Sequence, residues 1–170
     1  MNKLLRILRH RWLDDGDVRR ALPPEALERI AQRVTASERG HSGEVRVCVE
    51  AGLPLSYLWR NATARERAVT MFGKLRVWDT EHNNGVLIYL LLAERHIEIL
   101  ADRGLNRRVP PEQWKALVDG MAADFRAGRF EPGLAAAVDA VDALLDRHFP
   151  LAQGATRVNE LPDAPHVGGT

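Results

Sequence analysis

Hydrophobic patterns in the middle of the chain predict three β-strands. In residues 44–50, valines alternate with other side chains, which is the period-two pattern of a strand with two different faces. The mixed outer face of this segment predicts a strand at the edge of a sheet. Residues 86–93 are apolar on both faces, as in a central strand covered by helices on both sides. Residues 96–102 alternate again after a short link, which predicts an antiparallel hairpin with the central strand.

Apolar residues spaced by three and four positions predict helices around these strands. Pro23 and Pro24 open one helix, and Thr63 with Glu66 has the form of a capping box that starts another. Prolines open two further helices in the last third of the chain. The helix between the first two strands makes them parallel through a right-handed crossover. The predicted fold class is therefore α/β: a single three-layer α/β/α sandwich around a small mixed sheet.

Residues 1–22 form a basic N-terminal segment that begins with a short amphipathic helix. Leu4, Leu8 and Trp12 make an apolar stripe, and four basic residues occupy other positions. Two interpretations stay open. The stripe docks on the domain, or it contacts a membrane protein or an anionic membrane surface.

Composition agrees with one globular domain followed by a tail. Of the 170 residues, 45% are hydrophobic and 28% are charged, which is typical of a globular protein. We assign residues 23–150 to one domain. Residues 151–170 have little apolar periodicity and are predicted to be a disordered tail. A net charge of +1 provides no overall field for nucleic acid, so we expect no nucleic-acid partner.

The sequence predicts a cytoplasmic protein, either free or peripheral to the membrane. Arginines interrupt the N-terminal apolar residues, so there is no continuous hydrophobic region of a signal peptide. The longest apolar run, residues 86–93, is far shorter than the ~20 residues that span a bilayer. The single Cys48 excludes an intrachain disulfide framework. Nothing in the sequence specifies the oligomeric state.

Motifs of the common nucleotide-binding and metalloprotease sites do not occur in the sequence. There is no G-x-G-x-x-G after a strand, no P-loop and no H-E-x-x-H. Ser42 lies in a Gly-His-Ser-Gly run, but Glu44 stands where a serine-hydrolase elbow needs glycine. Ser42 is therefore not predicted to be a nucleophile.

The predicted topology nevertheless gathers polar residues at one edge of the sheet. The first two strands start at this edge and the third strand ends there. Carboxylate and amide oxygens can bind a hard cation such as calcium, and an arginine can grip a phosphate. The candidate metal ligands are Asp79, Glu81 and Asp102, and the candidate binding residues are His41, His82, Asn83, Asn84 and Arg103.

Turn chemistry explains the same residues equally well. Asn83, Asn84 and Gly85 form a turn sequence before a strand, and Asp79 can brace a loop. Open sheets also usually bind ligands at the carboxyl ends of their parallel strands, which is the opposite edge.

Three stretches of the chain are similar to segments of one known protein family. The run at residues 72–90, with Asp-Thr-Glu-His-Asn-Asn-Gly-Val-Leu at its centre, is similar to a family segment. Residues 96–105, which end in Asp-Arg-Gly-Leu, are similar to the family's next strand with its closing glycine, and residues 125–130 also fit. These stretches resemble the TPM-domain family, and the resemblance covers roughly residues 25–149. It implies an α/β/α sandwich and a divalent cation, such as calcium, bound at acidic residues near the sheet edge.

Two functions follow from these observations, and whether the chain is an enzyme stays open. The leading hypothesis is a non-catalytic binding or accessory domain at the cytoplasmic face of a membrane; similar bacterial proteins accompany LemA-type proteins. The alternative is a divalent-metal-assisted phosphomonoester hydrolase, because the family includes reported acid phosphatases. In that hypothesis Asp79, Glu81 and Asp102 hold the ion, Arg103 clamps phosphate, and His41 or His82 moves protons.

Overall fold

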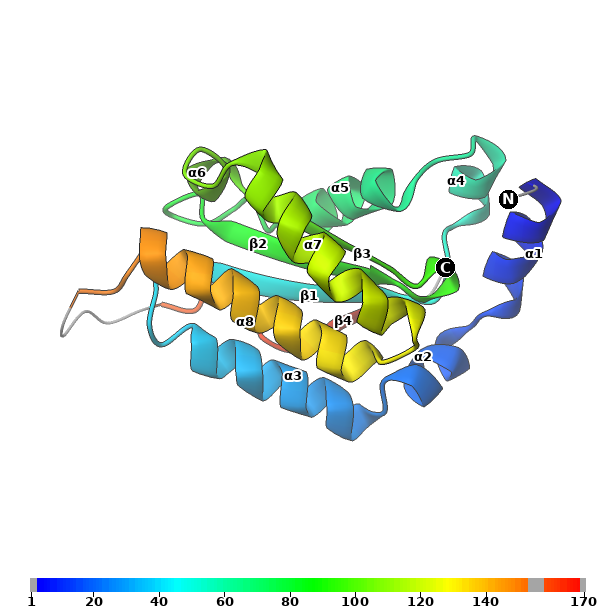
Figure 1. Cartoon of the computed structure of the whole chain (residues 1–170), viewed down its shortest axis with the longest axis horizontal. Coiled ribbons are helices and arrows are strands. Elements are labelled where there is room, and N and C mark those ends of the chain that lie inside the picture. Colours follow the sequence, from blue (N-terminus) through cyan, green and yellow to red (C-terminus); the bar gives the residue numbers. More distant parts are fainter. Residues whose placement is uncertain (1–2, 153–157, 169–170) are drawn as a thin grey trace.

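Four strands form one mixed sheet in the order β3-β2-β1-β4 (Figure 1). The computed structural model describes residues 3–152 and 158–168. β1 is parallel to β2 and to β4, and β2 is antiparallel to β3. The predicted α/β sandwich with a mixed sheet is confirmed. The strands are β1 (Glu44–Glu50), β2 (Gly85–Leu91), β3 (His96–Ala101) and β4 (His166–Gly168).

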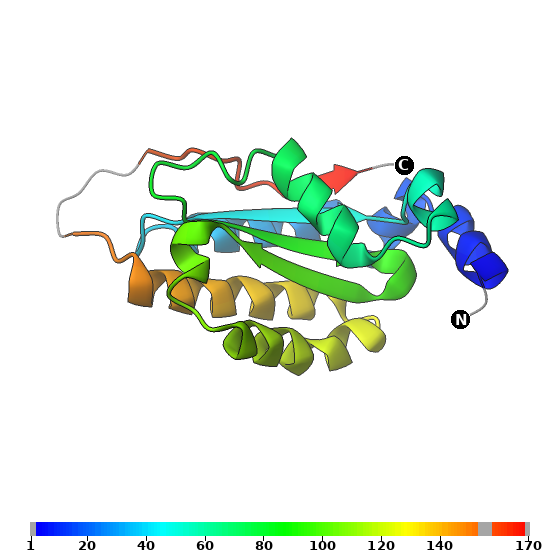
Figure 2. The same ribbon diagram turned by 90° about the horizontal axis from the view of Figure 1, so that it is seen from above.

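The central strand β2 is buried along its whole length and separates two apolar cores. Val86, Ile88 and Leu90 pack into the core under α3 (Pro24–Ser37), α7 (Pro111–Arg126) and α8 (Phe130–His148). Leu87, Tyr89 and Leu91 pack into the core under α5 (Ala64–Lys74). Figure 2 shows α5 on one face of the sheet and α7 with α8 on the other. The two-faced apolar run therefore has the central position that the sequence predicted.

Local signals fix where several helices start. The Thr63 side chain accepts a hydrogen bond from Glu66 N, and Thr63 N donates to the Glu66 carboxylate, so the predicted capping box is present. Asp14 and Asp17 form a second capping box at α2 (Asp15–Ala21), which sequence reasoning missed.

Three more short helices were also not predicted: α4 (Leu55–Trp59), η1 (Leu92–Glu94) and α6 (Arg103–Asn106).

The prediction that β1 is an edge strand is wrong. β4 pairs with its second half, with Cys48 opposite His166 and Glu50 opposite Gly168. Residues near the C-terminus of the chain cover polar side chains of β1. Arg46 donates to the carbonyl of Pro162, and Glu44 accepts a hydrogen bond from Leu161 N at 3.1 Å.

The prediction of a disordered tail is also wrong for residues 158–168. This segment buries Leu161 and then forms β4. Main-chain pairing with β1 and hydrogen bonds to Arg46 and Glu44 hold this segment in place. Such contacts need no apolar periodicity in the segment itself. Residues 153–157, 169 and 170 of the predicted tail lie outside the described residues.

A buried ion pair joins β1 to α5. Arg67 Nε donates to Glu50 Oε2 at 2.8 Å, and Tyr89 Oη donates to the same oxygen at 2.7 Å. Both charged side chains are less than a tenth exposed. Burial also raises the pKa of the neighbouring Cys48 thiol to about 12, so this thiol is protonated at neutral pH and packs as a small apolar group.

Candidate functional site

The polar residues predicted to share one sheet edge do lie at that edge. β1 and β2 begin there, and β3 ends there because it runs antiparallel to β2. Asp102 N donates to Gly85 O at 2.8 Å, which places the end of β3 beside the start of β2. Two segments that are distant in the sequence therefore meet, as the topology required.

Two side-chain pairs form within this group. Asn84 Nδ2 donates to Ser42 Oγ at 3.2 Å, and Arg103 Nε donates to Asn83 Oδ1 at 2.9 Å. Asn83 has a φ of 52°, in the left-handed region that asparagine tolerates in turns. These contacts fit the turn interpretation, because they connect the loop before β2 to the loop before β1 and to the start of α6.

The three predicted metal ligands have separate roles in the described contacts. Asp79 pairs with Arg76 on its own loop. Asp102 is the N-cap of α6, and its Oδ1 accepts from Arg103 N at 2.7 Å. Glu81 is exposed, and its main-chain nitrogen donates to the Glu160 carboxylate at 3.0 Å. Within residues 3–152 and 158–168, no three His, Cys, Asp or Glu side chains are arranged to hold a metal ion.

Two buried oxygens at this edge still match the chemistry of a hard cation. Asn84 Oδ1 and Asp102 Oδ2 have no hydrogen-bond partner among the described residues. A buried acceptor without a donor is costly, and calcium binds amide and carboxylate oxygens. Calcium binding therefore stays a prediction, with Asn84 and Asp102 as the residues that fit it.

The two predicted histidines lie in different environments. His82 is exposed, whereas His41 is fully buried and its Nε2 lies 3.2 Å from Asp142 Oδ1 on α8. Burial raises the pKa of Asp142, and the nearby Asp146 raises it further. Sequence reasoning missed Asp142, although its position among apolar residues of α8 was a signal that it faces a polar partner.

A second candidate surface lies at the opposite end of the sheet, where α1 (Lys3–Trp12) and α4 contact each other (Figure 1). α1 is fastened through a polar face. Arg6 Nε lies 2.8 Å from Glu94 Oε1, and His10 Nε2 lies 3.1 Å from the same oxygen. Leu53 N donates to His10 Nδ1 at 2.9 Å. α1 therefore docks on the domain through Arg6 and His10, and not through the apolar stripe that the sequence predicted.

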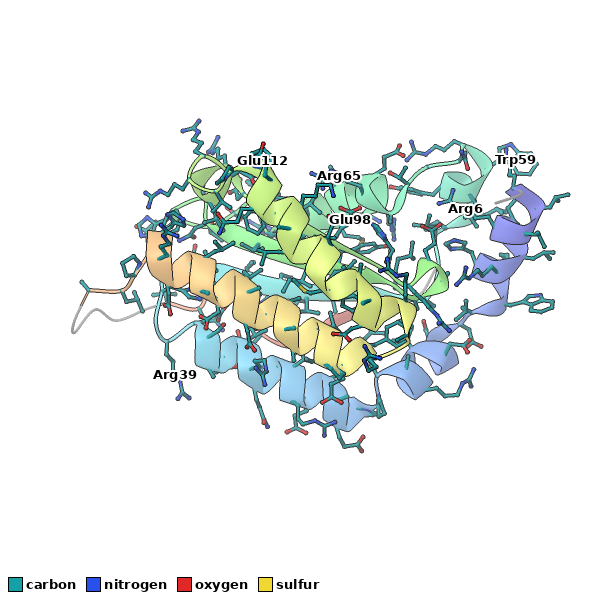
Figure 3. All side chains as sticks on the ribbon, viewed as in Figure 1. Arg6, Arg39, Trp59, Arg65, Glu98 and Glu112 are labelled. Carbon is teal, nitrogen blue, oxygen red and sulfur yellow. The ribbon has the colours of Figure 1, made fainter. Side chains whose placement is uncertain are left out.

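The apolar stripe of α1 points away from the body of the protein. Leu4, Leu5, Leu8 and Trp12 are between 49% and 82% exposed. On α4, Leu55 is 53% exposed and Trp59 is 71% exposed. Lys3 Nζ lies 5.4 Å from the centre of the Trp59 ring, so the two helices form one surface. We call this the α1/α4 surface; Figure 3 shows Trp59 beside the start of α1.

The chain is similar in sequence and fold to known proteins. The family model of the TPM domain matches residues 17–144, which is most of the chain. The chain belongs to the TPM domain family. The matched part begins after α1 and ends before β4, so it includes the α4 part of the α1/α4 surface and not the α1 part.

Solved structures are similar to this TPM domain over most of its length. The BA42 protein of the psychrophilic bacterium Bizionia argentinensis is 26% identical with a TM-score of 0.74, covering 86% of this chain and 95% of that chain. The N-terminal domain of a P. gingivalis protein is 23% identical with a TM-score of 0.60, covering 75% and 79%. The latter likeness concerns the fold alone. No curated protein matches this TPM domain in sequence.

Proposed function

We propose that this TPM domain is a non-catalytic accessory domain that binds an anionic membrane surface through the α1/α4 surface. The observation that carries the proposal is the outward apolar stripe of α1 together with Trp59 of α4. Among the residues that the structure describes, each helix is too short or too polar to cross a bilayer. The proposed contact is therefore interfacial.

The apolar part of this surface suits the boundary between headgroups and acyl chains. Single exposed hydrophobic residues are ordinary, but a contiguous exposed group marks an interaction site. Trp12 and Trp59 are the most exposed tryptophans of the chain. Tryptophan favours the membrane interface because its ring is apolar and its N–H remains near water.

The charges of α1 suit an anionic surface. The helix carries no acidic residue, and in a helix of 3.6 residues per turn Arg9 and Arg11 flank the apolar stripe on its two sides. Both arginines are exposed. Interfacial helices combine these two features, with apolar residues that enter the interface and basic residues that attract anionic headgroups.

Vesicle binding tests the proposal. We expect the protein to co-sediment with phosphatidylglycerol vesicles and not with phosphatidylcholine vesicles. The double variant Trp12→Ser, Trp59→Ser should bind the anionic vesicles at least tenfold more weakly, because each ring loses its burial in the interface. Trp78→Ser is the matched control, since Trp78 is 51% exposed elsewhere in the chain.

Two results would contradict membrane binding. One is the absence of binding to either kind of vesicle in low salt, which would make the α1/α4 surface a protein-docking face. The other is an equal loss of binding in the Trp78→Ser control, which would show that the tryptophans of the α1/α4 surface have no special role.

A second candidate property is calcium binding at the edge where Asn84 and Asp102 lie. It is supported by their two buried, unpartnered oxygens. We expect millimolar calcium to raise the melting temperature by binding the folded state, and Asp102→Asn to reduce the rise. Asp79→Asn should leave the rise intact, because Asp79 is already paired with Arg76. A wild-type protein whose melting temperature does not respond to calcium would remove this candidate.

The hydrolase alternative has less support than either of these. Its ion needed the carboxylates of Asp79, Glu81 and Asp102 around one site, but Asp79 is paired with Arg76. Among the described residues, no three His, Cys, Asp or Glu side chains are arranged to hold a metal ion. We therefore propose no reaction for this chain.

A further inference from the structure

A groove follows the outer edge of β3, away from both surfaces described above. It has a volume of about 600 Å³ and is lined by residues 98–101 of β3, by Trp114 and Val118 of α7, by Asn106, and by Arg65 of α5. β3 is the terminal strand on this side of the sheet. Figure 3 shows Arg65 and Glu98 together where α5 approaches β3.

The main chain of β3 presents hydrogen-bonding groups to this groove. Asp102 N bonds to Gly85 O, so Asp102 belongs to a hydrogen-bonded pair of the antiparallel ladder. Such pairs alternate with pairs whose main-chain groups point outward, which makes the N–H and C=O groups of Ile97, Ile99 and Ala101 face away from β2. The Ala101 carbonyl confirms this direction, because it accepts from Asn106 Nδ2 at 2.6 Å.

The outward groups of Ile99 have no partner in the part of the chain that the structure describes. A second unmatched donor lies in the same groove. Trp114 Nε1 is buried and has no hydrogen-bond acceptor among the described residues. A strand edge and a buried indole N–H therefore offer main-chain and side-chain hydrogen bonds to one occupant.

We infer that this groove binds an extended peptide segment of a partner protein, which adds to β3 as a further strand. Strand addition uses unpaired main-chain groups for affinity and side pockets for specificity. The occupant would place an apolar side chain against Trp114 and Val118 and a hydrogen-bond acceptor at Trp114 Nε1. At the rim, Arg65 pairs with Glu98 and Lys115 pairs with Asp119, and the two basic side chains are 64% and 76% exposed. An acidic side chain of the peptide would compete with Glu98 or Asp119 for these exposed cations.

The flanking helices favour a peptide over a second copy of this chain. α5 and α7 lie on opposite faces of the sheet, and both contact β3 (Figure 2). The β3 edge is therefore recessed between two helices. A second copy would bring its own α5 and α7 against these helices before its β3 could pair, whereas a single extended segment enters the groove.

Selection from a phage-displayed library of random dodecapeptides tests the inference, with the full chain as bait. The selected peptides should share an apolar residue next to an acidic one. N-methylation removes an amide donor from a synthetic peptide. We expect methylation at alternate positions to weaken binding at least tenfold, and methylation at the intervening positions to have little effect, because only one set of amides faces β3. Binding should also slow hydrogen exchange at the Ile99 amide.

Trp114→Phe keeps an aromatic ring and removes the indole donor, so it should weaken peptide binding about two- to tenfold. Trp78→Phe and Glu112→Gln are controls outside the groove and should leave the affinity unchanged. The inference is overturned if the library yields no binding peptide, or if the selected peptides tolerate N-methylation at every position. It is also overturned if the amide of Ile99 exchanges at the same rate with and without peptide.

Discussion

His10 and Glu94 are 84 positions apart in the sequence, and His10 Nε2 lies 3.1 Å from Glu94 Oε1. The same oxygen accepts a hydrogen bond from Arg6 Nε at 2.8 Å. One carboxylate at the end of η1 therefore holds two residues of α1. This attachment uses the polar face of α1 and leaves its apolar stripe outward, which is the arrangement on which the membrane proposal depends.

The pH dependence of stability should report this attachment. Hydrogen bonds from His10 and Arg6 hold the pKa of Glu94 at about 2, below its ordinary value of 4.5. A lowered pKa in the folded protein stabilises it fully above about pH 5, and this contribution is lost as the pH falls from there toward 2. We expect Glu94→Gln to cost about 2 to 3 kcal/mol at pH 7 and progressively less below pH 4.5.

Urea unfolding of the wild type and of Glu94→Gln between pH 7 and pH 3 measures this difference. Glu28→Gln, on the exposed side of α3, is a control with little expected effect at any pH. A constant difference between wild type and Glu94→Gln across this range would contradict the low pKa of Glu94.

The buried pair of Glu50 and Arg67 should be costly to break. Arg67→Met leaves the Glu50 carboxylate buried without its cation, and we expect the free energy of unfolding to fall by about 3 to 5 kcal/mol. Replacing both residues, as in Glu50→Leu with Arg67→Met, should recover much of this loss because no unpaired charge remains.

Chemical denaturation of the single and double variants provides the test. Arg33→Met is the matched control, because Arg33 pairs with Asp139 where both side chains are about half exposed, and it should cost less than about 1 kcal/mol. An equally small loss of unfolding free energy in Arg67→Met and Arg33→Met would contradict a stabilising role of the buried pair of Glu50 and Arg67.

Two glycine positions should respond to alanine in opposite ways. A Cβ at Gly85 would lie 2.0 Å from the carbonyl oxygen of Val77, so Gly85→Ala must displace main chain at the start of β2. We expect a loss of about 1 to 3 kcal/mol or more. At Gly73 in α5 a Cβ meets nothing within 4 Å, and Gly73→Ala should stabilise the protein by about 0.5 kcal/mol. Melting temperatures that change in the same direction would contradict this contrast.

Membrane binding should depend on the two arginines that flank the stripe of α1. Each basic residue near an anionic surface contributes about 1 kcal/mol, so Arg9→Gln with Arg11→Gln should weaken binding to phosphatidylglycerol vesicles about 30-fold. High salt should weaken binding of the wild type in the same direction.

Arg39→Gln with Arg107→Gln removes the same charge from exposed positions outside the α1/α4 surface. Figure 3 shows Arg39 at the other end of the molecule. We expect this control to bind nearly as well as the wild type. Equal weakening by the two double variants would mean that net charge, and not the α1/α4 surface, controls binding.

Patterns within single elements were sufficient for the sandwich and for the start of α5. The two-faced apolar run of β2 required cover on both sides, and the capping box of Thr63 and Glu66 is a local hydrogen-bond pattern. The helical connection makes β1 and β2 parallel, and the short link after β2 makes β3 antiparallel to it. The start of β2 and the end of β3 therefore lie at one edge, where Asn83 contacts Arg103. These features depend on the hydrophobic period of each element and on the right-handed connection between parallel strands. Both can be read from the sequence.

Tertiary structure decided the features that depend on partners distant in the sequence. β4 has three residues, too few to show a hydrophobic period, and it forms by main-chain pairing with residues 48–50 of β1. Its own composition therefore could not predict it. The outward direction of Leu4 and Trp12 was decided by Glu94, which binds the opposite face of α1. Asp79 and Asp102 lie at the same edge, but Asp79 pairs with Arg76, and one oxygen of Asp102 caps α6. The sequence determined which residues could meet, and the competition among nearby hydrogen-bond partners determined which of them did.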